Sequence, residues 1–204
     1  MGDWRDVNYP VMERFFTVQG EGAYTGASAW FIRLGGCDVG CAWCDVKESW
    51  DAEVHPKVDA GTLVDEAVQS GAPICVITGG EPAMHDLTSL TLGLQSAGLR
   101  THIETSGTHP MTGTWDWVTF SPKRFKSPLD AIYGASHELK IVVVNRHDLQ
   151  WGEEHAMKMP PAASRYFQPE WDRRDKVLPY IMEHLRTSPS WRISLQTHKY
   201  LGLP

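Results

Sequence analysis

The stretch from residue 30 to residue 44 reads Trp30-Phe31-Ile32-Arg33-Leu34-Gly35-Gly36-Cys37-Asp38-Val39-Gly40-Cys41-Ala42-Trp43-Cys44, and it decides which fold the sequence describes. Residues 30–34 have the aromatic and β-branched composition of a strand. This strand leads through two glycines into three cysteines with C-x3-C-x2-C spacing. Thiolates at this spacing can hold three corners of a [4Fe-4S] cluster and leave the fourth iron without a protein ligand. The stretch therefore predicts a strand followed by a cluster-binding loop.

The open iron would determine the chemistry of such a loop. An iron with free positions can bind the amino and carboxylate groups of a methionine sulfonium compound and pass an electron to the sulfonium, whereas a cluster held by four cysteines is saturated. Two alternatives to an iron–sulfur cluster stay open: a structural zinc site completed by His55 or Asp45, and buried cysteines that group by chance. The remaining cysteine, Cys75, lies inside another predicted strand and is expected to pack as a small apolar residue.

Short β-branched or aromatic runs recur along the chain and predict strands at residues 30–34, 74–77, 102–104, 117–120, 140–144, 165–167 and 192–195. Helical patterns end at Gly71 and Gly98, and a third, over residues 177–185, contains Pro179, which must kink the helix or lie in its first turn. Residues 127–133 and 151–161 give only weak signals for helix or loop. We expect an α/β fold, an open, incomplete, partial TIM-like barrel of about six or seven mostly parallel strands with outer helices.

Length and charge restrict the class of protein. With 204 residues, 42% of them hydrophobic, the chain is long enough for one sizeable core, and residues 1–204 are expected to form a single domain. A formal charge of -6 disfavours binding to nucleic acid and favours a small-molecule partner. Residues 1–6 are polar, unlike a signal peptide, and no run is apolar enough to span a bilayer, so we expect no membrane partner. The expected location is cytoplasmic, where a reducing environment favours metal binding over disulfides.

Polar residues follow several of the predicted strands, at residues 78–82, 104–107, 121–123, 168–169 and 196–198. In parallel α/β sheets and barrels, ligands bind at the carboxyl ends of the strands. We therefore expect these side chains to surround one ligand site, although each of them taken singly could be an ordinary polar strand end.

Two motifs together resemble the radical S-adenosylmethionine superfamily. One is the C-x3-C-x2-C loop, and the other is Gly79-Gly80-Glu81-Pro82, which resembles the element that meets the methionyl amino group through backbone and carboxylate oxygens. Alone, the second motif would be an ordinary turn. Nearly the whole chain then resembles one family, 7-carboxy-7-deazaguanine synthase, with residues 16–22 similar to its opening turn and residues 191–201 as its most specific signal. The resemblance implies a single radical S-adenosylmethionine domain.

The resemblance also implies a role for individual residues. The cluster ligands would be Cys37, Cys41 and Cys44. The substrate-binding residues would be Val18, Gln19, Gly20, Glu21, Arg33, Thr78, His198 and Pro204, the last through its terminal carboxylate. The residues facing S-adenosylmethionine would be Trp43, Asp45, Gly79, Gly80, Glu81, Glu104, Ser121, Pro122, Lys123 and Gln168. For Arg33 the chemistry agrees, because a guanidinium fork matches a carboxylate.

The implied reaction converts 6-carboxy-5,6,7,8-tetrahydropterin to 7-carboxy-7-deazaguanine with loss of ammonia, in queuosine and deazapurine biosynthesis. An adenosyl radical would take hydrogen from C6, the ring would contract, and the hydrogen would return to the adenosyl group. The implied partners are a reductant such as flavodoxin or ferredoxin and a second copy of the chain in a homodimer. Two alternatives remain: a glycyl-radical activating enzyme, and a zinc-stabilised binding module without catalysis.

One position departs from the family pattern. The family commonly follows its third cysteine with Asp-Ser or Asp-Thr, whose hydroxyl helps hold Mg²⁺, but here the pair is Asp45-Val46. Valine has no side-chain oxygen, and Mg²⁺ requires oxygen ligands. Either other groups and water hold a Mg²⁺ ion, or the enzyme has less need of it. We expect weakened dependence on magnesium.

Overall fold

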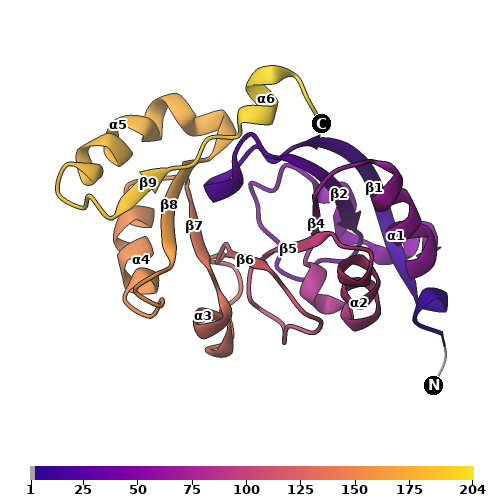
Figure 1. Cartoon of the computed structure of the whole chain (residues 1–204). Helices are drawn as coiled ribbons and strands as arrows, with labels where there is room; N and C mark the ends of the chain where they lie inside the picture. The colour runs from indigo at the N-terminus through magenta and orange to yellow at the C-terminus, as the bar shows by residue number, and fades with distance from the viewer. Residues whose placement is uncertain (1–2) are drawn as a thin grey trace.

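A nine-stranded open sheet organises the computed structural model, which describes residues 3–204 (Figure 1). Met1 and Gly2, with which the polar N-terminal stretch begins, lie outside the described residues. The strand order is β3-β1-β2-β4-β5-β6-β7-β8-β9. The strand bounds are β1 Asn8–Val18, β2 Ser28–Leu34, β3 Lys57–Asp59, β4 Ile74–Gly79, β5 Arg100–Thr105, β6 Trp117–Phe120, β7 Glu138–Val143, β8 Ser164–Pro169 and β9 Trp191–Ile193. Strands β2 and β4 to β9 form a continuous series of parallel pairs.

The predicted number of strands, six or seven, was wrong. Each of the seven predicted runs overlaps one of the parallel strands, and the two additional strands, β1 and β3, pair antiparallel at the edge of the sheet. Strand β1 is hard to predict from its sequence, because it contains Pro10 and the adjacent charged residues Glu13 and Arg14, and its burial does not alternate. Strand β3 has only three residues. Neither gives the period-two pattern by which a half-buried strand is detected.

The longer helices lie on the outer, convex side of the curved sheet in Figure 1. They are α1 Ala60–Gln69, α2 Thr88–Ser96, α4 His147–Ala156 and α5 Arg174–Leu185. Two short helices complete the set: α3 Ala131–Ala135 lies between β6 and β7, and α6 Thr197–Leu201 follows the last strand. Helix α2 packs on β5, α4 on β7 and β8, and α5 on β8 and β9. Pro179 is the sixth residue of α5 and so lies beyond its first turn. The weak signals near residues 127–133 and 151–161 correspond to parts of α3 and α4.

Six short 3-10 helices complete the described part of the chain: η1 Trp4–Asp6, η2 Gly22–Tyr24, η3 Lys47–Trp50, η4 Ala52–Val54, η5 Pro82–Met84 and η6 Trp171–Arg173. Among residues 3–204, no helix combines the length and apolar composition needed to cross a bilayer.

The two faces of the sheet differ in chemistry. Side chains that point outward, such as Ile103, Leu139 and Phe167, are fully or almost fully buried and form the main hydrophobic core with the helices. The residues that alternate with them point inward, and around β5, β7 and β8 they include Glu104, Lys140 and Gln168. Because neighbouring side chains of a strand point to opposite faces, a strand with an apolar outer face can carry charged groups inside. The inner face is therefore suited to a polar ligand.

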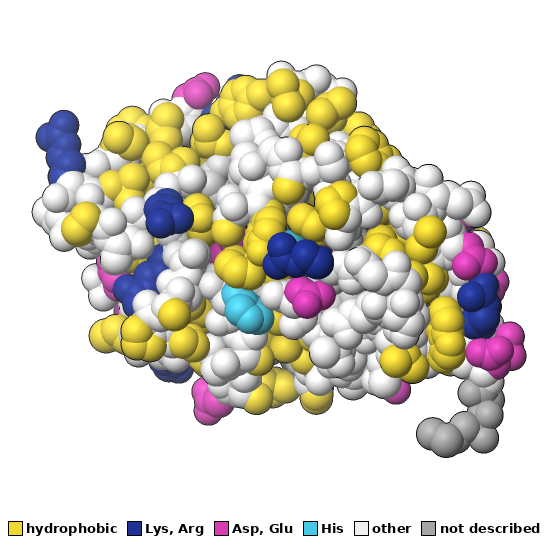
Figure 2. Space-filling view, viewed as in Figure 1, with side chains coloured by type: hydrophobic (Ala, Val, Ile, Leu, Met, Phe, Trp, Pro, Cys, Tyr) yellow, Lys and Arg dark blue, Asp and Glu magenta, His cyan; other side chains and the backbone are white. Residues whose placement is uncertain are grey.

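The C-terminal segment returns to the N-terminal part of the chain, as Figure 1 shows for α6 and β1. The backbone N–H of Thr197 donates to the Gly20 carbonyl at 2.9 Å, and the Thr17 hydroxyl donates to the Pro204 carbonyl at 3.3 Å. Over this part of the surface Figure 2 shows gathered hydrophobic side chains, and Phe16 and Leu201 are exposed. The two sequence regions that carry the family-specific signals thus lie side by side.

Candidate active site

A cavity of about 840 Å³ lies at the carboxyl ends of the parallel strands. It is lined by the cysteine loop, the ends of β4, β5, β7 and β8, the N-terminal turn at residues 18–21 and the C-terminal segment. All the predicted cluster, cofactor and substrate residues line it except Pro122, which is buried next to Ser121. Its volume falls within the usual range for small-molecule sites. Residues spread from Val18 to Pro204 therefore meet at one site.

The cysteine loop begins where the backbone of Gly35-Gly36 contacts that of Gly79-Gly80. The N–H of Gly80 donates to the Leu34 carbonyl at 3.0 Å, and the N–H of Glu81 donates to the Gly36 carbonyl at 2.8 Å. A Cβ on Gly80 would lie 2.3 Å from the Gly36 oxygen and 2.7 Å from the Cys37 Cβ. A Cβ on Gly79 would lie 2.2 Å from the Leu34 oxygen. Only glycine permits this approach, which fixes the start of the cluster loop against the end of β4.

The three cysteines of the loop are free thiols that line the same cavity. Burial raises the pKa of Cys37 and raises that of Cys41 to about 11, with Lys123 opposing the shift at Cys41. Because thiolates are the metal-binding form, a metal centre at this site must displace the protons. Three thiols facing one cavity, with no fourth cysteine beside them among the described residues, fit a cubane cluster that keeps one iron open.

The structure leaves a zinc site without a fourth ligand. His55 Nε2 is hydrogen-bonded to the Glu48 carbonyl at 2.9 Å, and the Asp45 carboxylate accepts from Lys199 at 2.7 Å. Within residues 3–204, no three histidine, cysteine, aspartate or glutamate side chains are grouped so that they could hold one metal ion. A cluster has separate iron corners, so its thiolates need not converge on a single point as zinc ligands do.

Lys123 places a positive charge beside the cysteine loop. Its ammonium donates to the carbonyl and hydroxyl of Ser121 at 2.6 and 2.7 Å and lies 5.9 Å from the centre of the Trp43 ring. Burial lowers the pKa of Lys123, and the nearby Cys41 opposes that shift. This predicted cofactor residue is thus placed to offset the negative charge of the thiolates.

Asp38, inside the cysteine loop, forms a cluster that sequence reasoning missed. Its carboxylate accepts from Lys126 Nζ at 2.5 Å and contacts His109 Nε2 at 3.0 Å, and these contacts hold its pKa below the usual range. His109 lies 71 residues and Lys126 lies 88 residues from Asp38 along the chain, so no local sequence pattern predicts these contacts. These contacts with Lys126 and His109 hold the cysteine loop in place at Asp38.

The Glu81 carboxylate is buried and fully engaged. Its oxygens accept from the Ala83 N–H at 3.0 Å, the Thr105 hydroxyl at 2.5 Å, and the N–H and hydroxyl of Ser106, the former at 2.7 Å. A carboxylate has about four acceptor positions, and these bonds use them. Glu81 therefore ties the turn after β4 to the end of β5.

Arg33 on β2 is in register with one residue on each of the two neighbouring strands. Glu13 on β1 is its register partner on one side and Thr78 on β4 on the other. Arg33 Nε donates to Glu13 Oε1 at 2.5 Å, and both Arg33 and Thr78 line the cavity. Glu13, which the sequence did not single out, orients the guanidinium and leaves its terminal nitrogens for a ligand carboxylate.

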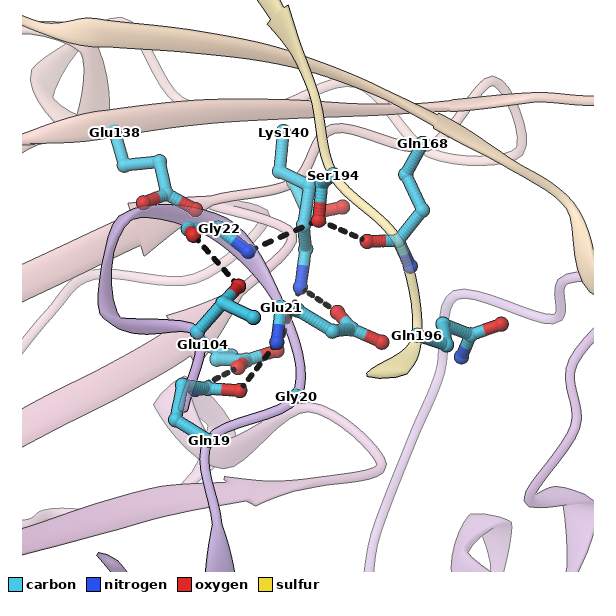
Figure 3. A network of polar contacts seen from close by, with 12 residues as sticks. Gln19, Gly20, Glu21, Gly22, Glu104, Glu138, Lys140, Gln168, Ser194 and Gln196 are labelled. Atoms are coloured by element: carbon cyan, nitrogen blue, oxygen red, sulfur yellow. Dashed lines mark hydrogen bonds and ion pairs between the residues drawn. The ribbon is translucent and has the colours of Figure 1, made fainter. Parts of the chain in front are cut away.

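The inner wall of the cavity is held by a charged network around Lys140 (Figure 3). The Lys140 ammonium contacts the carboxylates of Glu21 and Glu104, the latter at 2.8 Å. Gln19 Nε2 donates to Glu104 at 2.9 Å, and Gln19 Oε1 accepts from the Glu21 N–H at 3.0 Å. Sequence reasoning missed Lys140 and also Glu138, although charged residues at alternate positions of an otherwise apolar strand are a usable signal.

The C-terminal segment closes the cavity on the side of the N-terminal turn. A Cβ on Gly20 would lie 2.0 Å from His198 Nδ1, so the turn and α6 can approach only because residue 20 is glycine. Burial lowers the pKa of His198, and Glu21 opposes that shift. A chain of hydrogen bonds adds to the closure: the Gly22 N–H donates to the Ser194 hydroxyl at 2.9 Å, which donates to Gln168 Oε1 at 2.7 Å.

Comparison with known proteins identifies relatives of this chain. Residues 31–125 match the radical SAM superfamily. The chain is 49% identical over 195 residues to the 7-carboxy-7-deazaguanine synthase of Flavobacterium psychrophilum, covering 96% of this chain and 92% of that protein. It is 48% identical over 200 residues to the enzyme of the same name from Synechocystis, covering 97% and 94%. This chain belongs to the 7-carboxy-7-deazaguanine synthase family. The crystal structure of QueE from Escherichia coli is similar in fold, with a TM-score of 0.81 at 33% identity over 92% of this chain and 93% of that one.

Membership of the 7-carboxy-7-deazaguanine synthase family implies a [4Fe-4S] cluster and S-adenosylmethionine as cofactors. Val46 occupies the position at which this family is expected to have a hydroxyl that helps hold Mg²⁺. Val46 lines the cavity without a side-chain oxygen, and the neighbouring Asp45 carboxylate is paired with Lys199 and contacts Gln196 at 3.5 Å. Residue 46 therefore supplies no side-chain oxygen to a Mg²⁺ ion, and the carboxylate beside it is already paired with a lysine.

The contact between the glycine pairs generates a prediction. In Gly80→Ala the new Cβ meets the Gly36 carbonyl and Cys37, so the cluster loop must move. We expect the iron bound per chain after anaerobic reconstitution to fall several-fold and the free energy of unfolding to fall by about 2 kcal/mol. Gly134→Ala is the control, because its Cβ would meet no atom within 4 Å. Equal iron contents in the two variants would refute the assigned role of Gly80.

Proposed function

We propose that this chain is a radical S-adenosylmethionine lyase that converts 6-carboxy-5,6,7,8-tetrahydropterin to 7-carboxy-7-deazaguanine with loss of ammonia, a step of queuosine and deazapurine biosynthesis. The observation that carries the proposal is the single cavity: the three cysteine thiols, Arg33 and the two family-specific ends of the chain line it together. A glycyl-radical activating enzyme would need no pterin-binding ends. A zinc module would need the fourth ligand that His55 and Asp45 do not offer.

The residues that line the cavity have different roles in binding the cofactors and the substrate. When bound, the cluster and S-adenosylmethionine supply the electron and the radical that begin the reaction. Arg33, oriented by Glu13, binds the substrate carboxylate, and Glu21 and His198 offer hydrogen-bonding groups to the ring of the pterin. Glu104, Ser121 and Gln168, which line the same cavity, would contact the adenosyl group of a bound S-adenosylmethionine. The closure of α6 on the N-terminal turn excludes water from the reacting atoms.

The proposal includes the partners of the enzyme. A reductant such as flavodoxin or ferredoxin supplies the electron, and neither nucleic acid nor membrane takes part. The exposed apolar residues near α6 and β1, among them Phe16, Leu201 and Leu203, support a homodimer, because contiguous exposed apolar surface marks interaction sites. Residues 1–204 act as one catalytic domain, and the need for a cytosolic reductant supports a cytoplasmic location.

Anaerobic reconstitution with iron and sulfide tests the function directly. We expect a brown protein that, once reduced, forms 7-carboxy-7-deazaguanine from the carboxypterin and S-adenosylmethionine. The product is measured by chromatography and mass spectrometry, and Cys41→Ala, which lacks one cluster ligand, is the control expected to form none. A colourless protein that retains stoichiometric zinc, or a protein that cleaves S-adenosylmethionine but leaves the pterin unchanged, would overturn the proposal.

Magnesium dependence gives a second prediction. Because residue 46 has no side-chain oxygen and Asp45 is paired with Lys199, adding Mg²⁺ to cluster-loaded enzyme that has been freed of Mg²⁺ should change kcat/KM by less than about twofold. In Val46→Thr, which restores a hydroxyl, the response to Mg²⁺ should increase. A large, saturable gain in rate with the unmodified chain would contradict this account of Val46.

A further inference from the structure

Lys140 is a buried charge shared by two carboxylates that belong to different parts of the cavity. Its side chain is 4% exposed, whereas those of Glu21 and Glu104 are 13% and 20% exposed. The ammonium therefore lies in the wall of the cavity, and the two carboxylates lie nearer to the space that a ligand occupies. A buried charge is tolerated only when it is paired, and Lys140 is paired twice.

The two carboxylates reach Lys140 from distant segments. Glu21 comes from the N-terminal turn, 119 residues away, and Glu104 from the end of β5, 36 residues away. Gln19 joins them on the other side, because its amide group bonds to the Glu104 carboxylate and to the Glu21 backbone. The four residues form a closed ring, which Figure 3 shows from close by. Moving one carboxylate therefore disturbs the hydrogen bonds of the other.

The ring also fixes the charge of the site. Burial raises the pKa of Glu104, but the Lys140 ammonium and the bonds from Lys140 and Gln19 more than offset it, so the pKa lies below its usual range. Burial acts in the opposite direction on Lys140, whose pKa the two carboxylates raise. By contrast, Glu138, the carboxylate of β7, has a pKa raised by burial to about 7. The direct bonds from Lys140 and Gln19 thus keep Glu104 as an acceptor.

We infer that Lys140 is a positioning residue that couples the two ligand subsites: through the shared ammonium, a ligand bound at Glu104 orders Glu21, and a ligand bound at Glu21 orders Glu104. The inference rests on the proposed function, which assigns Glu21 to the pterin and Glu104 to the adenosyl cofactor. When one ligand binds, it orders the carboxylate that the other ligand contacts, so the second ligand loses less conformational entropy on binding. The two ligands therefore bind with positive and reciprocal cooperativity.

The test measures dissociation constants in the cluster-loaded enzyme under anaerobic, unreduced conditions, where binding occurs without turnover. S-adenosylmethionine is titrated with and without saturating carboxypterin, and the pterin is titrated with and without S-adenosylmethionine. In the unmodified chain we expect each ligand to tighten the other by the same factor, at least about fivefold. In Lys140→Met, which keeps most of the length of the side chain and removes its charge, we expect the factor to fall to about one.

Three further variants separate coupling from a general loss of structure. Lys158→Met changes an exposed lysine and should keep the unmodified factor. Lys140→Arg retains a cation and should restore part of the coupling. If Lys140→Met fails to fold or to bind iron, the variant Lys140→Met with Glu104→Gln, which leaves only one carboxylate without a partner, should fold and show a factor of about one.

The outcomes distinguish this inference from the proposed function. If the unmodified chain binds neither ligand, the proposed function fails. If it binds both ligands independently, or if the foldable Lys140 variants keep the full coupling factor, the inference about Lys140 is overturned while the proposed function stands.

Discussion

The close approach of two backbones, at the ends of β2 and β4, is the constraint on which the site depends. Hydrogen bonds from Gly80 and Glu81 to the carbonyls of Leu34 and Gly36 fix where the cysteine loop leaves the sheet. The engaged carboxylate of Glu81 then fastens the same turn to the end of β5. A loop anchored at its root can present three thiols to one cavity, and the polar ends of the neighbouring strands are held at fixed positions around it.

The sheet makes this site possible by separating its two faces. Its outer face buries the apolar side chains that stabilise the fold, so the inner face can carry Lys140, Glu104 and other polar groups whose burial costs free energy. Pairing reduces that cost within the network of Lys140, Glu21 and Gln19. The same network holds the N-terminal turn, to which the C-terminal segment binds through Gly20. Stability and ligand recognition are therefore assigned to opposite sides of the same strands.

Much of this could be predicted from local sequence, and the remainder depends on contacts between distant residues. The parallel strands are short apolar runs bounded by turns, so each was recognisable, whereas β1 and β3 lack such a pattern and the strand count was wrong. The motifs located the cavity because they mark strand ends, which meet in a parallel sheet. The partners that orient the predicted residues were missed: Glu13 is defined by antiparallel register, and the Asp38 cluster and the Lys140 network join residues far apart in the chain.

The central claim is that three cysteines hold a cluster whose fourth iron is open to S-adenosylmethionine. Mössbauer spectroscopy of the anaerobically reconstituted protein, recorded before and after S-adenosylmethionine is added, tests it most directly. The account predicts a [4Fe-4S] spectrum in which one iron changes its isomer shift when S-adenosylmethionine binds and the other irons do not. A spectrum unaffected by saturating S-adenosylmethionine would contradict it, because every iron would then already be fully coordinated.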